Sequence, residues 1–372
     1  MRISLIGPFP PFRGGISDFN SALSNELNKT HDLQIINYST QYPILLFPGK
    51  TQYKDDVAES QGSERVLSSI NPFTWIKTVN RIIEYQPDIV VIHYWMPFFA
   101  PALRKIAVLL KKKNDIKIIA ICHNLIPHEK YGFNQLFTKM FLNKIDRFVV
   151  MSESVKMDLL KIVPNAKYRL TPHPIYNIFG SAIDKDIARQ NLGIKTKNVI
   201  LYFGLIREYK GLDILLNSIP QIKRIINDFI VIVAGECYEK TEIYYDIINK
   251  LQIQDLVSLR FKFIPDNKIC EYFSAADVVA LPYRTATQSG ITQIAYNFNR
   301  PVIVSNVGGL AEIVLNGKTG FVVKPDSNEF AKAIVKYFKE DKFDEFSNNI
   351  QTHKQLFSWG KFVANLMELA KK

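Results

Sequence analysis

The chain has 372 residues, of which 47% are hydrophobic, and its formal net charge is +12. This length favours two domains of ordinary size, and the apolar content excludes global disorder. The excess of Lys and Arg predicts an acidic partner, which could be nucleotide phosphate, nucleic acid or an anionic membrane.

The three cysteines, Cys122, Cys237 and Cys270, are too few and too widely spaced for a disulfide framework or a zinc cluster. The sequence opens on an apolar strand pattern at residues 2–6 rather than on a signal peptide. No apolar run is long enough to span a bilayer. We therefore expect a cytoplasmic protein in a reducing compartment.

The first strand is followed by a loop that contains Gly14 and Gly15, and then by a predicted helix. Ile16, Phe19 and Leu23 fall on one face of that helix. A strand, a glycine-rich turn and a helix are typical of the opening of a nucleotide-binding domain. The alternative is a tight turn that binds no ligand.

Residues 39–71 form a long segment with little periodicity, and its apolar patch at 42–48 either contacts substrate or folds onto its own domain. A later stretch, 133–144, mixes Phe137 and Phe141 with Lys139. Cations beside apolar side chains suit a surface that rests on anionic lipid. A solvated basic face is the alternative.

Apolar runs at residues 88–93 and 117–122 predict buried parallel strands. His93 and His123 stand at their carboxyl ends, where ligands bind in such sheets, although a structural role is the more common one for a histidine. Tyr94 and Trp95 follow the first run and could stack on an acceptor sugar or belong to the core.

A strand at 147–152 closes the first half, and Ser152 is a candidate N-cap for a helix over 153–162. Residues 176–197 are predicted to be a linker with some helix at 184–192. A new strand then leads to Arg207 and Lys210. These cations, three residues apart and just before a helix, can both point at one diphosphate.

The most informative stretch is 277–321. Two Val- and Ile-rich strands, 278–281 and 302–304, are each followed by a turn of small residues, Ser289-Gly290 and Gly308-Gly309. Peptide N–H groups at the carboxyl ends of parallel strands and at helix N-termini hold anions. Both turns are therefore candidate phosphate or sugar loops.

This stretch resembles the sequences of a known family. The order of an Ala-Asp-Val-Val-x-x-Pro strand, a small-residue loop, a helix, a Pro-Val-Ile strand, Gly-Gly-x-x-Glu and Thr-Gly-Phe resembles the retaining glycosyltransferases of family 4, which have the GT-B fold. The resemblance implies an α/β protein with two Rossmann-like, doubly wound domains that face a central cleft. Residues 1–175 would form the acceptor-side domain and 198–354 the nucleotide-sugar-binding domain. Helices are expected over 328–340 and roughly 343–372. Residues 358–369 resemble the terminal helix that crosses back in GT-B proteins, so a C-terminal helix at about 355–372 would complete the first domain.

The resemblance also implies roles for individual residues. Arg207 and Lys210 would neutralise the donor diphosphate, and His123 would lie against the donor sugar. The family's two glutamates, eight residues apart, have no carboxylate counterpart between Ala286 and Ile294, so Gln293 or a backbone group would hold the ribose, and Asn299 stands where the family has glycine. The implied donor-binding residues are Gly14, Gly15, Gly204, Gly235, Ile264, Gln288, Ser289, Gly290, Gln293 and Glu312.

From this resemblance we expect transfer of sugar from a UDP- or GDP-sugar to a glycan or lipid-linked acceptor, with retention, in cell-surface polysaccharide or glycolipid synthesis. The protein would act at the inner face of the cytoplasmic membrane as a peripheral protein. Cationic side chains would replace a metal, and no other cofactor is expected. A catalytically silent GT-B binding or assembly subunit is the alternative. Nucleic acid is not an expected partner, because its recognition motifs are absent.

Overall fold

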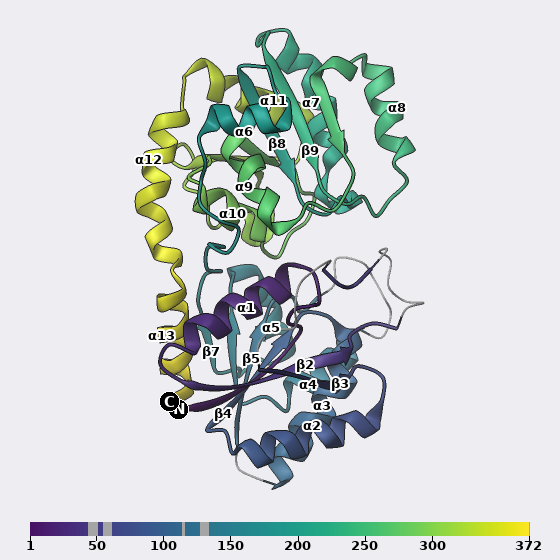
Figure 1. Ribbon diagram of the computed structural model, residues 1–372, viewed down its shortest axis with the longest axis vertical. Coiled ribbons are helices and arrows are strands. Elements are labelled where there is room, and N and C mark those ends of the chain that lie inside the picture. Colours follow the sequence, from purple (N-terminus) through teal and green to yellow (C-terminus); the bar gives the residue numbers. More distant parts are fainter. Residues whose placement is uncertain (44–50, 55–61, 114–115, 127–133, 372) are drawn as a thin grey trace. The chain divides into compact units, whose positions relative to one another are not determined.

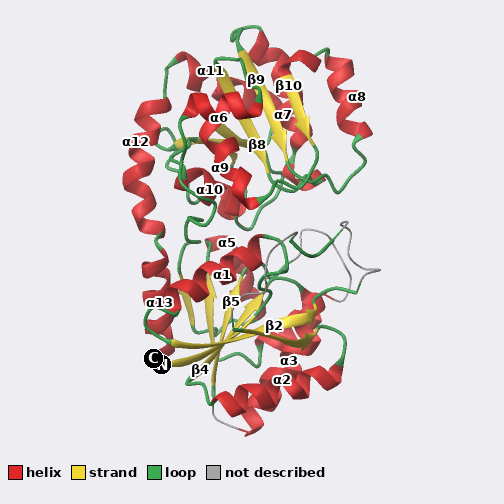
Figure 2. Ribbon diagram, viewed as in Figure 1, coloured by secondary structure: helices red, strands yellow, loops and turns green. Residues whose placement is uncertain are grey.

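The computed structural model describes residues 1–43, 51–54, 62–113, 116–126 and 134–371. These residues form two compact units, one made of Met1–His173 with Trp359–Lys372 and the other of Pro174–Ser358. Each unit has a parallel sheet with helices packed against it (Figures 1 and 2). The apolar patch predicted at 42–48 falls mostly outside the described residues.

The first unit holds a seven-stranded sheet with the order β3-β2-β1-β4-β5-β6-β7, in which every pair of neighbours is parallel. Its strands read as apolar runs because both faces are covered. The strands are β1 Arg2–Ile6, β2 Asp32–Thr40, β3 Ser63–Ser68, β4 Ile89–Tyr94, β5 Lys117–Cys122, β6 Arg147–Val150 and β7 Tyr168–Leu170; the helices are α1 Gly15–Leu27, α2 Pro72–Tyr85, α3 Ala100–Lys113, α4 Asn134–Leu142, α5 Glu153–Ile162 and α13 Trp359–Lys371.

Alternation along β4 and β5 decides which side chains meet which helices. Tyr94 and Cys122 belong to the core cluster that includes residues of α2, α3, α4 and α5. Because successive residues of a strand point to opposite faces, His93 and His123 lie on the other face, where α1 packs. The predicted N-cap at Ser152 is present, with Oγ accepting a hydrogen bond from the Val155 N–H at 3.2 Å.

The second unit repeats this design with a six-stranded parallel sheet in the order β10-β9-β8-β11-β12-β13. Figure 1 shows its strands and helices in teal, green and yellow. The strands are β8 Asn198–Phe203, β9 Phe229–Ala234, β10 Val257–Arg260, β11 Val278–Leu281, β12 Val302–Ser305 and β13 Gly320–Val323; the helices are α6 Lys185–Leu192, α7 Leu212–Lys223, α8 Glu242–Leu251, α9 Asp266–Ala275, α10 Gly290–Asn297, α11 Ser327–Lys339 and α12 Phe343–His353.

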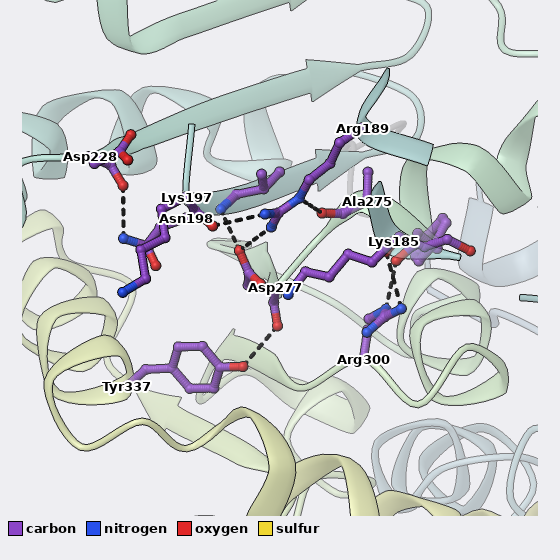
Figure 3. A network of polar contacts seen from close by, with 12 residues as sticks. Lys185, Arg189, Lys197, Asn198, Asp228, Ala275, Asp277, Arg300 and Tyr337 are labelled. Atoms are coloured by element: carbon purple, nitrogen blue, oxygen red, sulfur yellow. Dashed lines mark hydrogen bonds and ion pairs between the residues drawn. The ribbon is translucent and has the colours of Figure 1, made fainter. Parts of the chain in front are cut away.

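Helix α6, within the segment predicted to be a linker, belongs to the second unit. A buried carboxylate at Asp277, just before β11, anchors it (Figure 3). Asp277 accepts hydrogen bonds from the Arg189 guanidinium at 2.8 Å and from the Val199 N–H at 2.6 Å, and it pairs with Lys185. The linker prediction is therefore corrected, because these contacts tie residues 185–192 to the sheet.

The helical stretch predicted over roughly 343–372 contains two helices, α12 Phe343–His353 and α13 Trp359–Lys371. Helix α12 ends at His353, a 3₁₀ turn covers Lys354–Phe357, and Ser358 has extended backbone angles before α13 begins. The chain passes from the second unit to the first at this point. Within the described ranges, no helix combines the length and apolar character needed to cross a membrane.

Candidate active site

The second sheet reverses its strand order between β8 and β11, since β9 and β10 extend it on one side and β12 and β13 on the other. In open α/β sheets this switch point leaves a crevice at the carboxyl ends of the strands, where ligands bind. The loops after β8 and β11 carry Arg207, Lys210 and Ser289. The structure therefore places these predicted residues on both sides of the switch point.

The loop after β8 is a tight turn that rests against the end of β11. Gly211 has φ 65°, and a Cβ atom there would lie 2.1 Å from the carbonyl oxygen of Pro282, so only glycine permits the contact. Arg284, in the β11 loop, binds both carboxylate oxygens of Asp213 at 2.8 and 2.5 Å. These contacts fix the two loops to each other.

Lys210 is half-buried at this junction. Its Nζ lies 5.3 Å from the centre of the Tyr283 ring. No carboxylate forms an ion pair with it in the part of the chain that the structure describes. Burial lowers the pKa of Lys210, and the charge of Arg207 lowers it further. A bound anion would favour the charged form, so this position is electrostatically suited to phosphate.

Arg207 belongs to the same turn as Lys210. The Lys210 N–H donates to the Arg207 carbonyl at 2.9 Å. The Arg207 guanidinium lies 4.8 Å from the centre of the Tyr238 ring, within cation–π range. Two fixed cations thus stand at the carboxyl end of β8.

Gly204 and Gly235 end the neighbouring strands β8 and β9 in close contact. A Cβ atom on Gly235, where φ is 150°, would lie 1.9 Å from the Gly204 carbonyl oxygen. Backbone packing alone therefore requires glycine at 235. Their predicted contact with the donor stays a prediction.

Helix α10 begins beside Lys210. The Ser289 Oγ accepts a hydrogen bond from the Ile291 N–H at 3.3 Å and so caps the helix. Gly204 lies between this helix start and Lys210. A Cβ atom on Gly204 would be 3.1 Å from Ile291 Cδ1 and 3.5 Å from Lys210 Nζ. The partial positive charge at the α10 N-terminus therefore lies close to the lysine ammonium.

The side-chain amide of Gln293 is buried without a hydrogen-bond partner among the described residues. Its side chain is fully buried (0% exposed), and within the described residues neither its amide oxygen nor its amide nitrogen has a partner. Leaving such a group unpaired costs about 1–3 kcal/mol. A ligand hydroxyl that reached Gln293 would satisfy it.

Four further predicted donor-binding residues lie in loops or at a helix start of the same unit. Ile264 is buried in the loop after β10, and Gln288 precedes the α10 cap. Gly290 opens α10, where a Cβ would lie 2.9 Å from the Tyr176 ring. Glu312 is exposed after the 3₁₀ turn Gly308–Leu310 that follows β12.

The first sheet has its own switch point between β1 and β4. Gly14 is the residue before α1, and Gly15 is the first residue of that helix. His93 lies near the carboxyl end of β4, and His123 directly follows β5. The two imidazoles meet, with His93 Nδ1 and His123 Nε2 3.1 Å apart.

Both imidazoles are neutral. Burial lowers the pKa of His93 to about 3. Burial also lowers the pKa of His123 well below its ordinary value, and the neighbouring His93 and His173 lower it further. Neither ring therefore carries a charge at neutral pH.

The acceptor-side prediction fails for Tyr94. Its ring is fully buried (0% exposed), stacks on Phe141 with 4.9 Å between ring centres, and its hydroxyl is 2.8 Å from Thr138 Oγ1. Strand alternation turns Tyr94 into the core while His93 faces the opposite side. Trp95 is only partly buried, and its Nε1 donates to the Tyr42 hydroxyl at 3.1 Å.

Sequence reasoning missed two aromatic residues of these edges. Phe19 was placed on the buried face of α1, but nothing predicted that its ring centre would lie 4.9 Å from that of His123. Tyr283, the cation–π partner of Lys210, follows Pro282 directly, and that adjacency to a strand end was its only signal. In the described ranges, no three His, Cys, Asp or Glu side chains are grouped so as to hold a metal ion.

Two families match most of the chain. Residues 13–176 match the family described as Glycosyltransferase Family 4, and residues 197–340 match Glycosyl transferases group 1. The two matched ranges correspond closely to the two units and contain every predicted site residue.

Individual relatives agree. A putative glycosyltransferase, YtcC, from Bacillus subtilis is 27% identical over 65% of this chain and 64% of its own length. A GDP-mannose-dependent alpha-(1-6)-phosphatidylinositol monomannoside mannosyltransferase from Mycolicibacterium smegmatis is 26% identical over 85% of this chain and 83% of its own. The crystal structure of HepE from Anabaena in complex with UDP and glucose aligns with a TM-score of 0.72 at 17% identity, over 99% of this chain and 98% of that one, and so shares the fold.

Proposed function

Because the chain belongs to the family 4 glycosyltransferases and has the GT-B fold, we propose that it transfers a sugar, with retention, from a nucleotide-diphosphate sugar. UDP- and GDP-sugars are the donors we favour. UDP accompanies HepE, and the mycobacterial relative is named for GDP-mannose. The acceptor would be a glycan or a lipid-linked sugar.

The observation that carries this proposal is the cationic turn beside α10. The half-buried Lys210 and its neighbour Arg207 lie at the sheet's switch point next to a capped helix N-terminus. Cleavage of the bond between the anomeric carbon and the β-phosphate oxygen leaves negative charge on that oxygen. Fixed positive charge lowers the barrier, and loss of one such donor typically costs about 3 kcal/mol.

The remaining steps need no metal in this proposal. A new bond forms between the anomeric carbon and the acceptor oxygen on the face that the phosphate leaves, which retains the configuration. The acceptor proton passes to the departing phosphate oxygen, and the cations stabilise the nucleoside diphosphate that results. His123 orients the donor sugar, and Gln293 binds a ribose hydroxyl.

A screen of UDP- and GDP-sugars for thermal stabilisation tests donor binding. A ligand at a hundred times its dissociation constant contributes about 2.7 kcal/mol. Arg207→Ala and Lys210→Ala should abolish the shift. Lys223→Ala, which removes an exposed cation at the far end of α7, should leave it intact. Undiminished shifts in both site variants would refute the phosphate assignment.

A second part of the proposal concerns where the protein meets its acceptor. Helix α4 exposes Leu136 (57%) and Phe137 (42%) beside Lys139. We propose that this surface rests on the anionic inner face of the cytoplasmic membrane, where a lipid-linked acceptor for polysaccharide or glycolipid synthesis would be met.

Vesicle co-sedimentation tests the membrane contact. The protein should sediment with vesicles that contain anionic lipid and less with zwitterionic ones. Phe137→Ser should weaken that binding, whereas Ile243→Ser, at an exposed apolar position on α8, should not. Equal effects of the two substitutions would exclude α4 as the contact.

A catalytically silent binding or assembly subunit remains the second candidate, because no carboxylate lies between Ala286 and Ile294. It predicts donor binding without turnover. Release of nucleoside diphosphate from the stabilising donor, measured with and without acceptor lipid extract, separates the two. Release that depends on Lys210 favours the enzyme.

A further inference from the structure

Glu239, in the loop after β9, is bound to the cationic turn at residues 207–210 through its carboxylate. Its Oε1 accepts a hydrogen bond from the Glu208 N–H, and its Oε2 accepts from the Tyr244 hydroxyl at 2.9 Å. Tyr244 is buried on α8 (3% exposed). Burial raises the pKa of Tyr244, and the hydrogen bond to Glu239 raises it further, so the hydroxyl stays protonated and remains a donor. The carboxylate is therefore oriented by Tyr244 and holds the turn at Glu208.

Glu208 is also held from the other side of β8. Arg284, in the loop after β11, donates from Nη1 to the Glu208 carbonyl at 2.9 Å, and its own N–H donates to the Tyr209 carbonyl at 2.7 Å. In the second sheet β8 lies between β9 and β11. One flanking loop thus binds the Glu208 N–H and the other binds its carbonyl, so the turn is fixed from both sides.

The turn needs this support because its two cations repel each other. Burial lowers the pKa of Lys210, and the nearby charge of Arg207 lowers it further. Backbone contacts with the β9 loop oppose a separation of the two: the Ile206 N–H donates to the Glu236 carbonyl at 2.9 Å, and the Tyr238 N–H donates to the Ile206 carbonyl at 3.1 Å. These contacts reach the residue before the turn, and the carboxylate of the same loop extends them onto it.

A carboxylate beside a phosphate site is unfavourable unless it has another task. Its charge repels a bound diphosphate, at a cost that grows as water is excluded from the site. Each oxygen of Glu239 already accepts a hydrogen bond from the protein. Its position therefore fits a role in shaping the turn better than a contact with the ligand.

We propose that Glu239 is a positioning residue that holds the Arg207–Lys210 turn in the shape that binds the donor diphosphate. The inference rests on the proposed function for the diphosphate alone, since the contacts that fix the turn do not depend on it. All of these residues belong to the second unit. Loss of the carboxylate acceptors should release the Glu208 N–H and let the two cations move apart. Loss of the charge alone should not.

Hydrogen exchange of the full chain tests the hold on the turn without a ligand. Glu239→Leu removes both acceptors at similar size, and the Glu208 amide should then exchange about tenfold faster, because a hydrogen bond to a charged group is lost. In Glu239→Gln the amide oxygen can accept the same bond, so exchange should stay within about twofold of wild type. Unchanged exchange in Glu239→Leu overturns the proposal.

Two further variants guard this measurement. Glu239→Ser is polar and too short to reach the Glu208 N–H, so it should give the same acceleration and covers any unfolding caused by leucine. Glu242→Leu makes the leucine substitution at an exposed carboxylate on the first turn of α8 and should leave the Glu208 amide unchanged. Equal acceleration in Glu242→Leu would show a general effect of lost charge and would overturn the role of Glu239.

Calorimetric titration with UDP and GDP tests the link to the diphosphate. The Kd should rise about tenfold or more in Glu239→Leu. Glu239→Gln should bind as tightly as wild type or more tightly, because it keeps the hydrogen bond and loses the opposing charge. Equal weakening in the two variants, or tighter binding in Glu239→Leu, overturns the proposal. If the wild type binds neither nucleotide, the proposed function fails, and hydrogen exchange still decides whether Glu239 fixes the turn.

Turnover adds a readout that a merely structural role would not move. With a sugar nucleotide that the protein uses, Glu239→Leu should lower kcat about tenfold and raise the KM for the donor by less, because misaligned cations stabilise the leaving phosphate less well. The nucleoside diphosphate carries that extra charge, so its Kd should change more than the KM. Glu239→Gln should restore kcat. A raised KM with unchanged kcat in Glu239→Leu would contradict the positioning role.

Discussion

Asn299 keeps a backbone conformation that most side chains avoid. Its φ is 53°, in the left-handed region where glycine is favoured and asparagine is tolerated. Its Oδ1 also accepts a hydrogen bond from Lys354 Nζ at 2.8 Å. Asparagine can therefore replace glycine here, because it tolerates the same left-handed backbone conformation and adds the hydrogen bond from Lys354.

We expect Asn299→Ala to lower the free energy of unfolding by about 1–2 kcal/mol, because alanine is strained at this φ. Asn299→Gly should change it by less than about 1 kcal/mol, since glycine loses only the Lys354 contact. Urea denaturation of both variants measures the difference. Equal losses would show that the hydrogen bond, and not the backbone angle, matters here.

The buried histidine pair predicts a pH dependence of stability. The folded-state pKa of His93 is about 3, against an ordinary value of 6.5, so below pH 6.5 the unfolded chain binds a proton that the folded chain does not. The free energy of unfolding should therefore fall as the pH falls from 6.5 toward 3, by about 1.4 kcal/mol per pH unit for each such histidine.

His93→Leu should make the fall in unfolding free energy with pH less steep, because the unfolded variant has one fewer histidine to protonate. Urea denaturation between pH 5 and 7.5 should show a shallower decline in the variant than in the wild type. Above pH 7 the two curves should run parallel, which serves as the internal control. Identical slopes below pH 6.5 would contradict the assignment of a depressed pKa to His93.

At the scale of single elements, the Asp277 carboxylate joins α6 to two strands at the edge of the sheet opposite Lys210. Its partners are the Arg189 guanidinium, Lys185 and the Val199 N–H (Figure 3). Removing one member of a buried ion pair leaves the others uncompensated, which typically costs about 3–5 kcal/mol. Asp277 therefore contributes the charged part of the α6 anchor, beside the hydrogen bond from Arg189 to the Ala275 carbonyl.

Asp277→Asn is expected to destabilise the protein by about 3 kcal/mol or more and to loosen α6 first. Hydrogen exchange should show faster exchange in residues 185–192 than in α7. Asp186→Asn, on the same helix, lacks these partners and should change stability by less than about 1 kcal/mol. A similar loss in both variants would rule out the anchoring role.

Elements with a dense apolar pattern were predictable from the sequence, and those that depend on distant contacts were not. The strands at 88–93, 117–122, 278–281 and 302–304 and the cap at Ser152 agree with the structure, because burial on both faces and capping chemistry are local signals. Whether α6 is a linker or part of a unit depends on contacts with residues far away in the sequence, such as Asp277 and Ala275. The break at Ser358 follows from passage between units, which has no periodic signature.

The candidate site divides in the same way. Arg207, Lys210 and Ser289 could be placed at the carboxyl edge of a sheet because they follow predicted parallel strands and precede predicted helices. The burial of Tyr94 could not, because the choice of face for a strand residue depends on which helices pack there. The contact between His93 and His123 could not be predicted either, because it depends on the pairing of β4 with β5.

The first unit as a whole depends on α13, which comes from the far end of the sequence. Trp359 and Phe362 contact Phe19, with ring centres 5.0 and 5.5 Å away. Lys117 Nζ donates to the Ala370 carbonyl at 2.6 Å, and Arg147 donates to the Leu369 carbonyl. The helix therefore covers the same side chain that packs on His93 and His123.

Leu366→Ala should destabilise the first unit by about 2–5 kcal/mol, because Leu366 is fully buried in α13. Leu356→Ala, at an exposed position three residues before α13, should cost less than about 0.5 kcal/mol. Hydrogen exchange should accelerate in α1 and β7 and remain unchanged in β8. Acceleration in β8 alone would contradict the assignment of α13 to the first unit.

The placement of α13 also governs the order in which the protein can mature on the ribosome. Nascent chains usually complete their leading domain first, yet here the hydrophobic surface of Phe19 stays uncovered until translation has passed the whole of 174–358. At ordinary elongation rates that interval lasts on the order of 10 to 40 s. The unit synthesised first is thus the last to complete its core. During that interval its exposed apolar surface is available for a chaperone to bind.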